Sequence, residues 1–157
     1  MSVAAALLGH MDSAKYLARI DSLCTGDLTA AHGGSDVLMA GSHDRIVSLE
    51  LRSAVWTGDA AQRVRTVEDF HALKDHLAVL LDTRWGARRP WWMGTLVVRI
   101  DRGEPISEPW ATCSTLVDDL DLWQPTGTGR WLALGVLEGE MDDEVHLLAL
   151  VTDTAPP

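Results

Sequence analysis

Apolar residues recur every three or four positions in three segments of the chain, and this spacing predicts three helices. The first covers Asp12–Cys24, and the longest covers Thr66–Asp82 with Thr66 as its capping residue. The third covers Ser107–Leu120, and Trp123 lies on an extension of its apolar stripe. The stripe of the longest helix predicts four core residues, Phe70, Leu73, Leu77 and Leu80.

Alternating apolar and polar residues predict strands in much of the remaining chain. Arg45–Trp56 alternates over its length, which is typical of a strand with one buried and one solvated face. The short apolar run Asp36–Ala40 precedes it across a turn, so the two segments suggest a hairpin. Arg130–Glu138 and Glu144–Thr152 flank an acidic turn and suggest a second hairpin. Apolar residues occur at positions on both sides of these two strands, which indicates that parts of both faces of the sheet are covered.

The segment Trp85–Asp101 is predicted to carry the chain from the longest helix into a central strand, Thr95–Asp101. Adjacent side chains of a strand point to opposite faces. Counting back along the alternating positions of this strand therefore places Trp92 on the buried face and Trp91 on the other. A bulge at Gly94 would reverse the two assignments.

The predicted elements follow the order helix, strand, strand, helix, strand, helix, strand, strand. Strand–helix alternation is incomplete, and hairpins are expected at both ends of the sheet. This order favours a single α+β domain of 157 residues, with a mainly antiparallel sheet and helices packed on one face. Such a layer can curl around an apolar cavity.

Charge narrows the range of partners. The chain has 23 Asp and Glu residues against 13 Lys and Arg residues, a formal net charge of −10. This balance argues against nucleic acid, which needs cations to replace its counterions, and against anionic membranes. It is compatible with a basic protein partner or with solubility alone. Cys24 and Cys113 form no C-x-x-C pair, and the N-terminus lacks a basic export signal, so reduced thiols and a cytoplasmic location are expected.

The common nucleotide, hydrolase and metalloprotease motifs are absent, and no cofactor is expected. His71 and Asp75 are four residues apart on the polar face of the longest helix, an arrangement that suits a general base or an ordinary surface pair. His76 lies at the border of the apolar stripe and is a third weak catalytic candidate. The candidate metal ligands that lie close together in sequence are His32, Asp36, His43 and Asp44. Their composition is typical of a turn and their spacing matches no known metal site, so no metal site is expected.

Tryptophan gives the strongest functional signal. The chain has seven Trp residues but one Phe and one Tyr, and several Trp residues fall at the ends of predicted elements. Such residues suit the core, the mouth of a pocket or the anchors of an interface. Arginines beside them could hold a carboxylate or stack on the indoles. The candidate ligand-binding residues are Trp85, Arg88, Arg89, Trp91, Trp92, Trp110 and Trp131.

Two functions follow from this pattern. The first is a bacterial protein with a Trp-lined apolar pocket that binds a hydrophobic or aromatic small molecule, with or without cofactor-free cyclase or isomerase activity. The second is an acidic module, such as an immunity protein, that masks a basic protein partner. An inward Trp cavity would favour the first function. The second would be favoured by an exposed Trp patch ringed by Asp118, Asp119, Asp121, Asp142 and Asp143.

Overall fold

The computed structural model describes residues 3–28, 36–53, 60–138 and 144–157. The end of the expected strand at Trp56, together with His32, Asp142 and Asp143, lies outside these residues. Along the chain the elements are α1 (Val3–Thr25), β1 (Val37–Ala40), β2 (Asp44–Ser53), α2 (Ala60–Trp85), β3 (Arg89–Trp92), α3 (Gly94–Asp101), α4 (Trp110–Leu116), β4 (Asp119–Trp123), β5 (Trp131–Glu138) and β6 (Glu144–Thr152).

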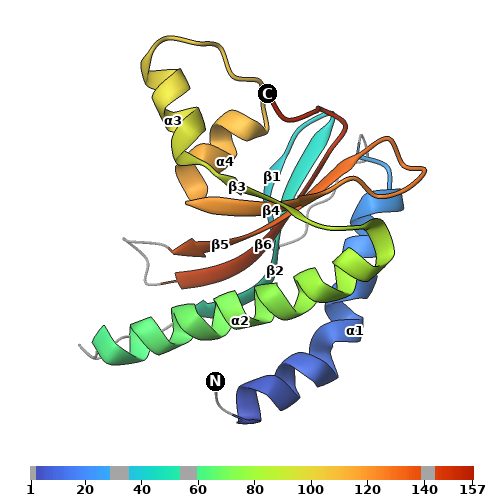
Figure 1. The fold of residues 1–157 in the computed structure, drawn as a ribbon, viewed down its shortest axis with the longest axis vertical. Helices are drawn as coiled ribbons and strands as arrows, with labels where there is room; N and C mark the ends of the chain where they lie inside the picture. Colours follow the sequence, from blue (N-terminus) through green and yellow to red (C-terminus); the bar gives the residue numbers. More distant parts are fainter. Residues whose placement is uncertain (1–2, 29–35, 54–59, 139–143) are drawn as a thin grey trace.

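The strands form one open sheet in which every pairing is antiparallel (Figure 1). In the described part of the chain this sheet has six strands, ordered β1-β2-β6-β5-β4-β3, so β1 and β3 lie at its edges. Both predicted hairpins are present, as β1–β2 and β5–β6, but β5–β6 forms the centre of the sheet rather than its expected second end. The single α+β domain with an antiparallel sheet is confirmed.

Helices cover both faces of the sheet, because the central strands are apolar on both sides. In β6, Leu147 and Ala149 contribute to a core cluster with α1 and α2, whereas Leu148 and Leu150 contribute to a second cluster with α3 and α4. The prediction that the helices pack on one face is therefore wrong, since among the described helices only α1 and α2 lie on the first face. The short helices α3 and α4 complete the second face, which agrees with the mixed apolar pattern of β5 and β6.

Helix α2 begins earlier than predicted, at Ala60, and its apolar stripe packs on the sheet. Phe70 and Leu77 are confirmed as core residues, while Leu73 and Leu80 are half-buried. Lys74 lies in the same stripe, four residues after Phe70, and is also buried. A charged residue within an apolar stripe needs a partner, and this one has its partners on β4.

The predicted strand over 95–101 is wrong, because the chain forms helix α3 there. The amide of Met93 donates to the Asp118 carbonyl oxygen, and the amides of Leu96 and Val97 then donate to the Met93 carbonyl oxygen. The extended segment is therefore β3, which ends at Trp92. The third predicted helix is also shorter than expected, since α4 ends at Leu116 and the chain continues into β4.

Candidate functional site

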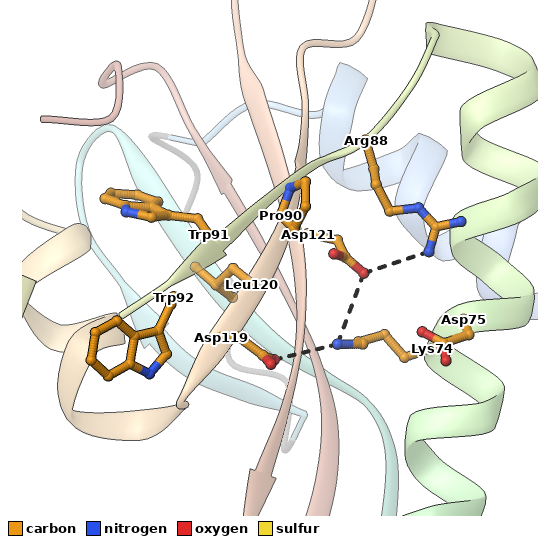
Figure 2. A pocket seen from close by; sticks show the side chains of 9 residues that line it. All are labelled: Lys74, Asp75, Arg88, Pro90, Trp91, Trp92, Asp119, Leu120 and Asp121. Carbon is orange, nitrogen blue, oxygen red and sulfur yellow. Dashed lines mark hydrogen bonds and ion pairs between the residues drawn. The ribbon is translucent and has the colours of Figure 1, made fainter. Parts of the chain in front are cut away.

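A cleft of about 620 Å³ lies between α2 and two neighbouring strands, the edge strand β3 and its partner β4 (Figure 2). Its two sides come from segments far apart in sequence, which the β3–β4 pairing and the packing of α2 bring together. It is lined by Lys74, Asp75, Arg88, Pro90, Trp91, Trp92, Asp119, Leu120 and Asp121.

The Lys74 ammonium group lies between two carboxylates of β4. Its Nζ is 3.4 Å from Oδ1 of Asp119 and 3.8 Å from Oδ2 of Asp121, and its side chain is 7% exposed. Asp119 and Asp121 are two residues apart on one strand, so both side chains face α2. The contacts are long for charged groups, so Lys74 neutralises charge without binding either carboxylate tightly.

Asp121 is the most enclosed carboxylate of the cleft. Burial is the main influence on this carboxyl and raises its pKa, although Lys74 and Arg88 oppose the effect. The Arg88 guanidinium is 3.9 Å from the Asp121 carboxylate. Asp121 is thus held between two cations on the inner wall of the cleft.

Asp82 fixes the position of Arg88. Its Oδ1 accepts hydrogen bonds from the Arg88 amide at 2.8 Å and from the Trp123 indole at 3.0 Å. Its Oδ2 accepts from the Arg88 guanidinium at 2.9 and 3.1 Å. Partial burial raises the pKa of Asp82, but the hydrogen bonds from Trp123 and Arg88 outweigh it and the pKa lies below its usual value. The three bonds with Arg88 anchor the start of β3 to the end of α2, and the bond with Trp123 ties the end of β4 to the same carboxylate.

Trp91 and Trp92 occupy opposite faces of β3, but with the reverse assignment to the prediction. Trp91 pairs with Leu120 and packs into the second core cluster, with its ring centroid 5.4 Å from that of Trp110. Trp92 pairs with Asp119 and is 66% exposed. The predicted parity was wrong because it was counted from a strand over 95–101, whereas the pairing of β3 with β4 sets the actual faces.

The Trp92 indole lies against the first residue of α3. A Cβ atom added at Gly94 would overlap its six-membered ring, so the absence of a side chain at Gly94 permits this position. Val97 and Val98 are on the same side of α3 as Gly94, three and four residues later, and both are exposed. We call Trp92, Val97 and Val98 the Trp92 face.

The other predicted ligand-binding residues do not line the cleft. Trp110 is 0% exposed, and its Nε1 donates to the backbone oxygens of Thr154 and Ala155. Trp131 packs against the second core cluster and Trp85 against the first. Arg89 is exposed and pairs with Leu122, on the opposite face of β3 from Trp92. Within the described part of the chain, the candidate tryptophans therefore do not converge on one apolar cavity.

Of the three weak catalytic candidates, Asp75 lines the cleft and the two histidines do not. His71 Nε2 is 3.9 Å from Glu138 Oε1, so its neighbour is β5. His76 has a buried Nε2 atom without a hydrogen-bond partner among the described residues. His71 is thus close to β5, whereas Asp75 lines the cleft, so the two residues lie in different surroundings.

Within the described segments, no group of three or more His, Cys, Asp or Glu residues is arranged to hold a metal ion. In the same segments, no helix combines the length and apolar character needed to cross a bilayer. No protein-family model, curated protein or solved structure matches this chain. The function must therefore be argued from the cleft and its surroundings.

Proposed function

We propose that the protein is an acidic binding module that docks a basic protein partner through the cleft and the Trp92 face. One observation carries this proposal, namely that Trp92 is 66% exposed beside the carboxylates of the cleft rather than buried in a cavity. Exposed tryptophans that adjoin charged groups are frequent anchors of protein interfaces.

Charge supports a basic partner. The cleft has three carboxylates against two cations, and Asp118 is exposed next to Asp119. Both cations already face carboxylates of the protein itself, so neither is an open site for an anion. The net charge of −10 would also accelerate encounter with a positively charged protein, more strongly at low salt.

Apolar surface next to the cleft supports a protein rather than a free ion. Val97 and Val98 are 40% and 46% exposed on α3, beyond the indole of Trp92. Contiguous apolar surface with a polar rim is typical of interaction sites. On binding, the Trp92 face would bury apolar surface against the partner, and the carboxylates would select basic partners.

A second candidate is a small-molecule site in the same cleft, because its volume of about 620 Å³ suits a small ligand. Five of the nine lining residues are charged, so such a ligand would combine polar groups with apolar surface, in contrast to the purely hydrophobic molecule expected from the sequence. A small ligand would leave Val97 and Val98 uncovered, whereas a protein would cover them.

Selection from a display library of random peptides tests the main proposal. We expect the selected peptides to be enriched in Lys and Arg, and to lose most of their binding to the Trp92→Ala variant. Val64→Ala is the matched control, because Val64 is 55% exposed near the start of α2, away from the residues that line the cleft. Selection of neutral or acidic peptides, or equal binding to wild type and Trp92→Ala, would contradict the proposal.

A further inference from the structure

We infer that the cleft accepts an arginine side chain of the partner, with the guanidinium group stacked on Trp92 and hydrogen-bonded to Asp119. This inference rests on the proposed docking of a basic partner and specifies which of its side chains enters the cleft.

Trp92 and Asp119 form the first part of the arginine site. They are directly opposite each other on β3 and β4, so their Cβ atoms are roughly 4.5–5.5 Å apart on one face of the sheet. Figure 2 shows Trp92 and Asp119 next to each other, with the Asp119 carboxylate directed toward Lys74 and the indole on the side away from Lys74. A flat cation can therefore contact the ring and a carboxylate oxygen together.

Unused acceptors form the second part. Among the described residues, Asp119 has one hydrogen-bond partner, Lys74, which donates to Oδ1. The other oxygen is open to an incoming donor, since the side chain is 55% exposed. Asp75 is exposed and has no hydrogen-bond or ion-pair partner within the same residues. Asp119 is thus the carboxylate next to Trp92 with acceptor capacity remaining, while Asp75 adds negative charge on the opposite wall.

Lys74 explains why the incoming cation stays in the outer part of the cleft. Its buried ammonium group already lies between the inner oxygen of Asp119 and Asp121, where a second cation would meet like charge. The outer part leaves room for a planar group along Trp92. Guanidinium has five N–H donors in one plane and stacks on aromatic faces, whereas an ammonium group is a compact point charge. Arginine therefore fits better than lysine.

The test compares three peptides of equal length, each with four Gly-X repeats, where X is arginine, lysine or the uncharged isostere citrulline. Binding is followed by the indole N–H signals of the ¹⁵N-labelled protein. We expect the arginine peptide to shift the Trp92 signal and to bind about fivefold more tightly than the lysine peptide, while citrulline binds negligibly.

Variants locate the site. Asp119→Asn and Trp92→Ala should each weaken the arginine peptide by about fivefold, and Asp75→Asn should weaken it by a smaller factor. Asp118→Asn removes the same charge from the neighbouring exposed residue outside the cleft and is the matched control. Trp92→Ala also keeps the test valid if Asp119→Asn fails to fold, because Trp92 is 66% exposed.

Each remaining outcome overturns the inference. Equal binding of arginine and lysine peptides, or equal losses in Asp118→Asn and Asp119→Asn, would mean that charge alone is recognised, and docking of a basic partner would still stand. Absence of binding by all three peptides would reject the arginine site, and the display selection would then decide the proposed function separately.

Discussion

Replacing Asp82 with Asn tests how much the contact between Asp82 and Arg88 stabilises the folded protein. Asp82 accepts two bonds from the Arg88 guanidinium, one from the Arg88 amide and one from the Trp123 indole. An Asn at this position can keep its oxygen toward the amide and the indole. Its NH₂ group would then face the guanidinium, so two charge-assisted bonds are lost and two donors oppose each other.

The cost follows from these contacts. Hydrogen bonds to charged groups contribute about 1.5–3 kcal/mol when buried. The side chains of Asp82 and Arg88 are 29% and 26% exposed, so solvent weakens their interaction. We therefore expect Asp82→Asn to lower the free energy of unfolding by about 2 kcal/mol near neutral pH, from the two lost bonds after this discount.

The pH dependence has a definite sign. The pKa of folded Asp82 is below the ordinary value of 3.8, so its stabilisation is complete above that value and is lost as the pH falls through the lower folded pKa. Urea unfolding of wild type and Asp82→Asn should differ by a constant amount from about pH 7 to about pH 5, and should converge below about pH 4. Asp118→Asn is the control for removal of one exposed charge. A loss under about 0.5 kcal/mol, or a difference that grows in acid, would refute the reasoning.

Three further results are expected. Burial raises the pKa of both Cys24 and Cys113 to about 12, so a thiol reagent at about pH 8 should label them only on unfolding, and rapid labelling of the folded protein would contradict their burial. Leu77→Ala should cost about 2–5 kcal/mol in urea unfolding, because Leu77 is 0% exposed, and a near-zero cost would place it outside the core. Gly94→Ala should change the free energy of unfolding by less than about 1 kcal/mol while shifting the Trp92 indole N–H signal, because the added methyl displaces an exposed ring. An unchanged signal would disprove the contact.

The fold could be predicted where one hydrophobic period dominates. Period two in β2, the apolar segments of β5 and β6 on either side of an acidic turn, and the stripe of α2 were sufficient for these elements and for the α+β class. The segment 94–101 was ambiguous, because Leu96, Val97, Val98 and Ile100 fit a short helix as well as a strand. The backbone hydrogen bonds at Met93 favour the helix, and these bonds cannot be predicted from the sequence.

The cleft could be predicted only in part. Arg88, Trp91, Trp92 and Asp75 were candidates, but their arrangement depends on the pairing of β3 with β4 across a long stretch of chain. Residues 119–123 were expected near the end of a helix, so this pairing was not available from local pattern. Lys74 did leave a signal, since a charge within the apolar stripe of α2 indicates a buried partner.

The central claim is that the cleft and the Trp92 face bind a basic partner. Its most direct test is backbone N–H chemical-shift mapping with a display-selected basic peptide at saturation. We predict that the largest shifts fall on β3, on α3 and on Asp75 and Asp119, and that the opposite edge strand β1 stays unchanged. Largest shifts on β1, or shifts that leave Trp92 and Asp119 unaffected, would contradict the account.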